Sequence, residues 1–309
     1  MIYLRNVTKT FDDVTALDDF GMTLKKGSIY GLIGKNGAGK TTILKILSGV
    51  IKADSGEVTI DGESVYENAA LKSRLSFIPD DLSFFSRYTL KEAGRFFASI
   101  YETWDQLLFE RIIFEFQLNP SKNLARFSKG MQKQAVFALS LGTSPDYLFL
   151  DEPIDGLDPI VRKKVWNYII TASAERQMTT LISSHNLREM EGICDYVGII
   201  ADGKMLLEKE LDELSNDVHK VQISFGTGGG FYTSDSSATP EGAYNSLNVV
   251  HAEKRGAVDI LIVRNDMASL ERWNDQYKPL LFDPLPLTLE EVFIYELGGA
   301  NNATIEIIG

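Results

Sequence analysis

Short apolar runs typical of strands alternate with helical patterns through the first two-thirds of the chain. The run Ile29–Ile33 leads into a glycine-rich loop, and apolar residues then recur at helical spacing from Ile43 to Leu47. Two later runs, Tyr147–Leu150 and Met178–Ser183, have the same strand character, and each follows a helical stretch. This alternation predicts a parallel sheet flanked by helices.

Two β-rich runs end in Asp-Gly pairs, which indicate tight hairpin turns. Asp61-Gly62 follows the run Val58–Ile60, and Asp202-Gly203 follows the run Val197–Ile200. Between the first hairpin and Tyr147 the pattern is mainly helical. The sequence therefore predicts an α/β fold with a mixed sheet, an antiparallel β subdomain and a helical insertion at about residues 84–145.

The composition changes after about residue 215. Glycine, serine, threonine and proline are concentrated between Gly226 and Pro240, which indicates a turn region. Beyond it, Val258–Val263 has strand character, and Thr288 with Glu291 forms a capping box before an apolar helical pattern. We expect a small α+β accessory domain. Its role is either in packing or in regulation, and the sequence favours neither. The predicted domains are residues 1–215 and 216–309.

The overall composition limits the classes of function. The 309 residues are 44% hydrophobic and carry a formal net charge of −12, so a broad nucleic-acid footprint, which needs clustered Lys and Arg, is not expected. Cys194 is the single cysteine, so a disulfide within the chain is excluded and a reducing compartment fits. No run approaches eighteen consecutive apolar residues, so any role at a membrane is expected to depend on a partner.

The glycine-rich loop after Ile33 matches a phosphate-binding pattern. Residues Gly34–Thr41 read G-x-x-x-x-G-K-T between a buried strand and a helix, which is the context that this P-loop motif requires. Glycines let several backbone N–H groups turn toward a phosphate, and the helix N-terminus adds a favourable dipole. Lys40 would neutralise the β- and γ-phosphates, and the Thr41 hydroxyl would bind Mg²⁺. We therefore expect a P-loop NTPase core that binds ATP and Mg²⁺.

Two acids emerge from the end of a buried strand. Asp151 and Glu152 directly follow the run Tyr147–Leu150, and open parallel sheets bind their ligands at the carboxyl ends of the strands. Asp151 fits a partner of Mg²⁺, and Glu152 fits the base that activates the attacking water.

Four further segments identify the family that the chain resembles. Residues 127–134, Phe-Ser-Lys-Gly-Met-Gln-Lys-Gln, resemble the signature segment of ATP-binding cassette proteins, in the S-x-G-M variant of drug-export and antibiotic-resistance cassettes. Residues 155–159 resemble the D-loop of that family, His185 its switch histidine, and Phe11 the aromatic residue that stacks on adenine. The resemblance covers roughly residues 1–215, and its motifs occur in the family order.

The resemblance implies a set of site residues. The expected catalytic residues are Lys40, Glu152 and His185. The expected metal ligands are Thr41, Asp80 and Asp151. The expected nucleotide-binding residues are Phe11, Gly34, Asn36, Gly37, Gly39, Lys40, Thr41, Thr42, Ser128, Gly130 and Asp158.

The resemblance also implies how the protein works. Two cassettes would face each other head to tail, so that ATP bound at Lys40 of one is covered by Ser128 and Gly130 of the other. One position departs from the family, because Asp80 stands where a glutamine usually ends a strand. An ionised aspartate can ligate a hard cation but cannot donate a hydrogen bond.

The leading hypothesis is the ATPase subunit of a membrane transporter, of the export type that the resemblance implies, with its permease on a separate polypeptide. It would work as a homodimer, or as a heterodimer with another cassette, on the cytoplasmic face of the membrane. The alternatives are a cassette ATPase that acts on ribosomes or DNA, and a nucleotide-binding regulatory module that does not turn over. The presence of Glu152 and His185 weighs against the regulatory module, and the acidic charge weighs against nucleic acid.

Overall fold

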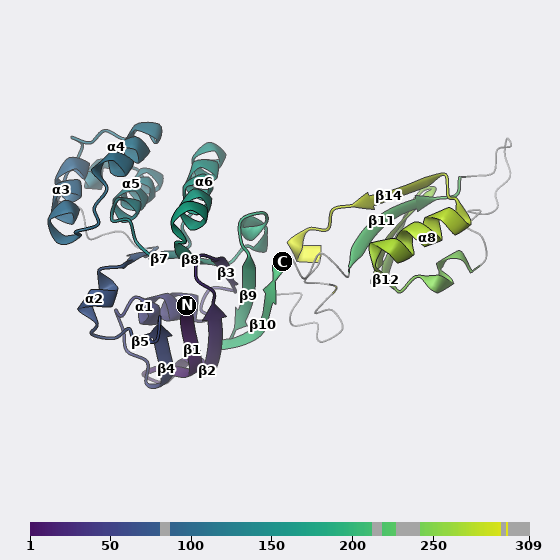
Figure 1. Cartoon of the computed structure of the whole chain (residues 1–309), viewed down its shortest axis with the longest axis horizontal. Helices are drawn as coiled ribbons and strands as arrows, with labels where there is room; N and C mark the ends of the chain where they lie inside the picture. Colours follow the sequence, from purple (N-terminus) through teal and green to yellow (C-terminus); the bar gives the residue numbers. More distant parts are fainter. Residues whose placement is uncertain (81–86, 212–217, 227–241, 292–294, 296–309) are drawn as a thin grey trace. The chain divides into compact units, whose positions relative to one another are not determined.

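The computed structural model describes residues 1–80, 87–211, 218–226, 242–291 and 295. The chain divides into two compact units, Met1–Glu208 and Lys209–Gly309 (Figure 1). Each unit has its own sheets and its own apolar core, so each is described by itself.

The first unit is organised around a mainly parallel sheet with the strand order β10-β9-β3-β8-β7-β6. Strands β6, β7, β8, β3 and β9 pair in parallel, as the alternating pattern predicts. Strand β10 lies beside β9 after the turn Asp202-Gly203, in which both residues have positive φ, as a two-residue hairpin turn requires. The strands of this sheet are β3 (Ile29–Ile33), β6 (Leu75–Ile78), β7 (Tyr147–Asp151), β8 (Thr179–Ser184), β9 (Tyr196–Ala201) and β10 (Lys204–Glu210).

A second sheet of the same unit is antiparallel and has the order β2-β1-β4-β5. The predicted Asp61-Gly62 turn joins β4 to β5, with φ of 52° and 80° at its two residues. Its strands are β1 (Ile2–Phe11), β2 (Val14–Leu24), β4 (Ser55–Ile60) and β5 (Glu63–Ser64). This sheet confirms the predicted antiparallel β subdomain.

Helix α1 (Lys40–Leu47) joins the two sheets into one core. Its apolar residues Ile43, Leu44, Ile46 and Leu47 are buried together with side chains of β1 and β2 on one side and of β3, β7 and β8 on the other. Burial of a large aliphatic side chain contributes about 1.5–3 kcal/mol, so this helix is strongly fixed behind the loop that precedes it.

The predicted helical insertion is present between β6 and β7. Figure 1 shows α3, α4 and α5 grouped together, and α5 is the longest of the three. The remaining helices of the unit are α2, before β6, and α6, between β7 and β8. Their bounds are α2 (Ala69–Lys72), α3 (Leu90–Ile100), α4 (Gln106–Glu115), α5 (Lys129–Gly142) and α6 (Pro159–Arg176), with 3₁₀ turns η2 (Leu124–Arg126) and η3 (Leu187–Met190).

The second unit is α+β, as predicted. Its sheet has the order β12-β13-β11-β14 with antiparallel pairing, and α8 lies beside it (Figure 1). Leu270 and Trp273 of α8 are buried in one cluster with Val221, Ile223 and Leu261 of the sheet. Thr288 and Glu291 form the predicted capping box, while the rest of the helix predicted after them lies outside the described residues. The elements are β11 (His219–Ser224), η4 (Ala243–Ser246), β12 (Val249–Arg255), β13 (Val258–Val263), α8 (Met267–Tyr277) and β14 (Leu281–Leu285).

None of the helices in the described part of the chain combines the length and the apolar character that crossing a bilayer requires.

Candidate functional site

The candidate site forms where the parallel strands β3, β7 and β8 end at the same edge of the sheet. In the register of these strands, Ile33 of β3 pairs with Ser184 of β8, and Asp151 of β7 pairs with Ser183 of β8. The residues after Ile33, Asp151 and Ser184 therefore emerge next to one another. This is the edge at which open α/β sheets bind ligands.

The glycine-rich loop between β3 and α1 is held in a shape that side chains would not tolerate. Gly39 has φ of 111°, and a Cβ atom added there would lie 2.7 Å from the Ala16 carbonyl oxygen. A Cβ added at Gly34 would lie 2.4 Å from the Ile200 carbonyl oxygen. Gly39 thus fits closely against β2, and Gly34 fits closely against β9.

Lys40, the first residue of α1, is buried with 6% of its side chain exposed. Its Nζ donates to the Gly34 carbonyl oxygen at 2.5 Å and lies 3.3 Å from Oε1 of Glu152. A buried ammonium needs negative partners. The lysine is therefore placed to meet an anion at the helix N-terminus, where the dipole also favours negative charge.

Thr41, Asp151 and Ser183 form a hydrogen-bonded chain beside this lysine. The Thr41 hydroxyl donates to Oδ2 of Asp151 at 2.7 Å, and the Ser183 hydroxyl donates to Oδ1 of Asp151 at 2.6 Å. Asp151 is buried, with 3% exposure, so the two hydroxyls fix the orientation of its carboxylate.

Glu152 has an unusual backbone and two side-chain partners. Its φ is 47°, a left-handed value that is rare for residues other than glycine. Its Oε2 lies 3.0 Å from Nδ1 of His185, which comes from the end of β8. Because a carboxylate only accepts hydrogen bonds, Nδ1 of His185 is the donor, and Nε2 points away from this contact.

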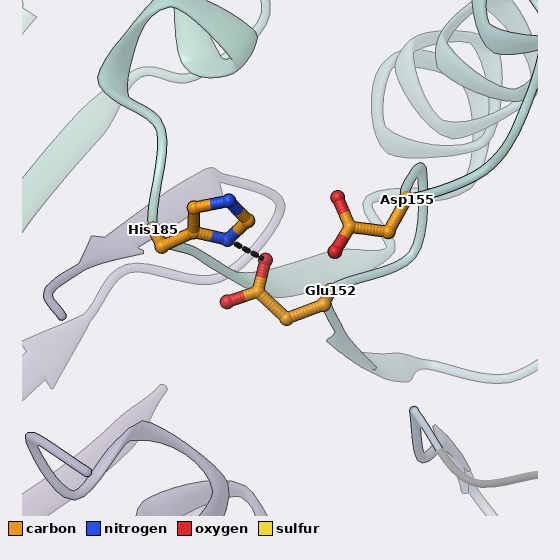
Figure 2. A group of neighbouring side chains, drawn as sticks. All are labelled: Glu152, Asp155 and His185. Carbon is orange, nitrogen blue, oxygen red and sulfur yellow. Dashed lines mark hydrogen bonds and ion pairs between the residues drawn. The ribbon is translucent and has the colours of Figure 1, made fainter. Parts of the chain in front are cut away.

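The surroundings of His185 favour its protonated form. The hydrogen bond that His185 donates to Glu152 is the largest cause that raises the pKa of His185 above its ordinary value, and the charges of Glu152, Asp155 and Glu189 add to it. Figure 2 shows the Glu152 carboxylate next to the His185 ring and the Asp155 carboxylate on the same side of the ring. One ligand atom from each of these three residues lies within 4.8 Å of the other two, so His185 faces two acids at close range.

A pocket of about 300 Å³ brings most of the expected site residues together. Of the residues proposed from the sequence, those that line it are Asn36, Gly37, Gly39, Lys40, Thr41, Thr42, Asp80, Asp151 and Glu152. Gly34 reaches the site through its carbonyl oxygen, which accepts from Lys40. His185 reaches it through Glu152.

Besides Gly34 and His185, four expected residues are not among those that line the pocket. Phe11 ends β1 and is 44% exposed, with Nζ of Lys9 5.3 Å from its ring centre. Ser128 is the N-cap of α5, and its hydroxyl accepts from the Met131 N–H at 3.3 Å. Gly130 lies in the first turn of α5, and Asp158 is the N-cap of α6. These four residues therefore lie on parts of the first unit outside the pocket.

Sequence reasoning missed three residues at the site. Ser183 was assigned only to a strand, although its hydroxyl orients Asp151. Asp155 was assigned only to a loop, although it faces His185. Lys133, four residues into α5, donates to the Glu152 carbonyl oxygen at 2.7 Å and to Oδ1 of Asp80 at 3.0 Å. For Lys133 the sequence gave one indication, its place in the same motif as Ser128, and this did not predict the contact with Glu152.

The glycine-rich loop, the buried lysine and the paired acids at the carboxyl edge define a nucleotide-binding protein of the P-loop class. The family described as ABC transporter matches residues 17–155 of the chain. The ABC transporter ATP-binding protein YtrB of Bacillus subtilis is 30% identical over 97% of this chain and 99% of its own length. The bacitracin transport ATP-binding protein BcrA of Bacillus licheniformis is 36% identical over 69% of this chain and 71% of its own.

A solved structure described as the ATP binding subunit of an ABC transporter has the same fold. It is 26% identical, with a TM-score of 0.64, and the match covers 69% of this chain and 91% of that one. The chain belongs to the ATP-binding cassette family, as an ATP-binding protein of the ABC transporter type, and it is an ATPase. The similarity to YtrB extends over nearly the whole chain, so it includes the second unit.

Proposed function

We propose that this chain is the ATP-hydrolysing subunit of an exporter and drives a separate permease from the cytoplasmic face of the membrane. The transport of bacitracin named for one relative supports export of a drug-like or peptide-like compound. The observation that carries the proposal is the convergence of the Lys40 ammonium, the Thr41–Asp151 pair and the Glu152 carboxylate at one pocket.

The loop and the start of α1 would bind the phosphates of ATP. Backbone N–H groups from Gly34 to Gly39, with Asn36 among them, would surround the β-phosphate, while Lys40 neutralises the β- and γ-phosphates. Thr42, on the first turn of α1, would contact the α-phosphate side of the nucleotide. Phe11, exposed at the end of β1, would stack on adenine.

The oxygen donors beside Lys40 suit Mg²⁺. The Thr41 hydroxyl and the Asp151 carboxylate are hard oxygen ligands that already lie in hydrogen-bond contact at the pocket wall. Asp80 lines the same pocket and would add a third oxygen near the cation. When bound, Mg²⁺ would neutralise charge that develops on the phosphates.

Glu152 is positioned to act as the general base. Its carboxylate lines the pocket next to Lys40, and its strained backbone fixes the direction in which the side chain leaves β7. His185 holds Oε2 of Glu152 through Nδ1, and protonated His185 would offer Nε2–H to the γ-phosphate.

The expected residues outside the pocket fit a partner cassette. Ser128 and Gly130 begin α5, a helix of 14 residues whose N-terminus favours an anion, and we propose that they cover the ATP of a second cassette chain. Asp158, the N-cap of α6, would lie at the same dimer contact and couple the two sites. We expect the dimer to form from two copies of this chain or from this chain and another cassette, without nucleic acid as a partner.

The substitution Glu152→Gln tests the proposal. It removes the base and keeps the shape, so ATP turnover should fall by about a hundredfold or more while ATP binding persists. Sedimentation velocity with saturating MgATP should then show dimers that wild-type protein forms only transiently. Glu175→Gln, an exposed acid on α6, should retain wild-type turnover. A Glu152→Gln protein that stays monomeric in MgATP, including with its permease present, would rule out the sandwich mechanism.

A further inference from the structure

Lys133 connects three parts of the first unit that the proposed mechanism treats separately. It lies one turn into α5, in the segment that begins with Ser128, and only 12% of its side chain is exposed. Its Nζ donates to the Glu152 carbonyl oxygen at 2.7 Å and forms an ion pair with Oδ1 of Asp80 at 3.0 Å. The ammonium therefore joins the helix, the residue after β7 and the residue near the end of β6.

The contact with Glu152 falls on the strained part of the site. Glu152 has φ of 47°, and such a conformation persists only where the surrounding structure holds it. On one side, the Glu152 N–H donates to Ser183 of β8, at 3.3 Å to its carbonyl oxygen and 3.2 Å to its hydroxyl. On the other side, Lys133 holds the carbonyl group. Both backbone polar groups of Glu152 are thus fixed by different elements.

The ion pair with Asp80 fixes the lysine in turn. A partly buried ammonium needs a negative partner, and a charged donor makes a stronger hydrogen bond to a carbonyl than a neutral one does. Asp80 is 62% exposed and occupies the position at which the family usually has glutamine. A neutral amide there could not balance the charge of Lys133. The departure at Asp80 and the lysine in the signature segment therefore belong to one arrangement.

We infer that Lys133, paired with Asp80, is a positioning residue that fixes the backbone of Glu152 and so aims its carboxylate at the attacking water. This inference rests on the proposed role of Glu152 as base. It assigns the helix that begins at Ser128 a second task, toward the nucleotide site of its own chain. It also gives Asp80 a role that does not depend on metal binding.

The substitution Lys133→Met tests the inference, because methionine keeps much of the length and removes the donor. In steady-state ATP hydrolysis by the full-length chain, kcat should fall by about ten- to a hundredfold, which is the effect of losing one charged hydrogen bond. KM for ATP should change by less than about threefold, because Lys133 contacts no group proposed to bind phosphate. Lys133→Arg keeps a donor and should recover much of kcat, whereas Lys133→Gln should not.

Lys164→Met is the matched control. Lys164 also donates to a backbone carbonyl at 2.7 Å, that of Glu115, but it joins α6 to the end of α4. This variant should keep wild-type kcat. A Lys133→Met protein with the kcat of Lys164→Met would overturn the inference, as would equal losses in the Arg and Gln variants.

A second readout separates this role from a role in the partner cassette. The double variant Glu152→Gln with Lys133→Met should still form MgATP-dependent dimers, because positioning of the base is not needed for closure. Loss of those dimers, or a KM increase in proportion to the fall in kcat, would show that Lys133 serves nucleotide capture and would refute the inference. The proposed function fails instead if two results occur together: wild-type protein does not hydrolyse ATP, and the Glu152→Gln protein does not form MgATP-dependent dimers.

The pairing with Asp80 is tested at saturating Mg²⁺, so that any effect on metal affinity is masked. Asp80→Asn should lower kcat less than Lys133→Met does, and the double variant should be no worse than Lys133→Met alone. Multiplicative losses would show that Asp80 acts independently of Lys133 and would contradict the pairing.

Discussion

The charges of two side chains, Glu152 and Asp155, should affect how readily His185 is protonated. Because Asp155 and Glu152 raise the pKa of His185, Asp155→Asn should lower that pKa, and Glu152→Gln should lower it further, since the Glu152 hydrogen bond is the largest cause. The chain has three histidines, so the His185 signal can be assigned by substitution and followed by NMR from about pH 5 to 9 in nucleotide-free protein. An unchanged midpoint in Asp155→Asn would contradict this account.

The same shift has a definite sign in stability. A histidine whose folded pKa lies above its unfolded value, about 6.5, stabilises the fold fully below that value, and the contribution is lost as pH rises through the folded pKa. His185 is 46% exposed, so solvent screens the effect. Asp155→Asn should therefore flatten the dependence of the melting temperature on pH in this range without changing its direction.

Individual site residues were predictable where a motif attaches them to the end of a strand. Lys40, Thr41, Asp151 and Glu152 lie at or after the ends of buried strands, and the parallel register of these strands brings them into one pocket. Lys133 could not be predicted in the same way. Its contact with Glu152 depends on how α5 packs against β6, and that packing joins residues far apart in the sequence.

At the scale of an element, the loop before α1 should tolerate no side chain at Gly39. Gly39→Ala adds a Cβ 2.7 Å from a backbone oxygen, whereas Gly62→Ala, also at a positive φ, meets nothing within 4 Å. Both variants bear the strain of a left-handed alanine, about 1–2 kcal/mol. Only Gly39→Ala should also displace the loop, lower the melting temperature further and weaken MgADP binding by at least about tenfold. Equal effects of the two substitutions in calorimetry and in equilibrium binding would refute this.

Elements with strong local signals were predicted, and those without them were not. The Asp-Gly turns and the helix after the glycine-rich loop are encoded by adjacent residues, and the structure confirms them. Helix α8 was missed because only Leu270 and Trp273 of its residues are buried, which leaves too short an apolar stripe. Strand β12 was missed because all its residues are exposed, so it shows no alternation.

At the scale of the whole molecule, the two units are held together internally by separate cores. The core of the first unit includes α1 and both of its sheets, whereas that of the second unit includes Val221, Leu261 and Trp273. Among the residues that the structure describes, those that line the nucleotide pocket all belong to the first unit. We therefore expect that either unit can unfold while the other keeps its packing and its activity.

The substitution Trp273→Ala should unfold the second unit selectively. Trp273 is 3% exposed, donates from Nε1 to the Ala243 carbonyl oxygen at 2.6 Å and packs against the rings of Tyr244 and Tyr277. Replacing a buried tryptophan by alanine costs about 3–5 kcal/mol, which should lower the melting temperature of a unit of this size by more than about 10 °C.

The matched variant is Trp166→Ala on α6, where the tryptophan is 7% exposed in the first unit. In differential scanning calorimetry, the transition that MgADP raises identifies the unit that binds nucleotide. Trp273→Ala should lower the other transition and leave the affinity for MgADP within about twofold of wild type, whereas Trp166→Ala should lower the nucleotide-sensitive one. A single transition that moves equally in both variants would mean that the two cores unfold as one, and that the second unit supports the nucleotide site through the stability of the whole chain.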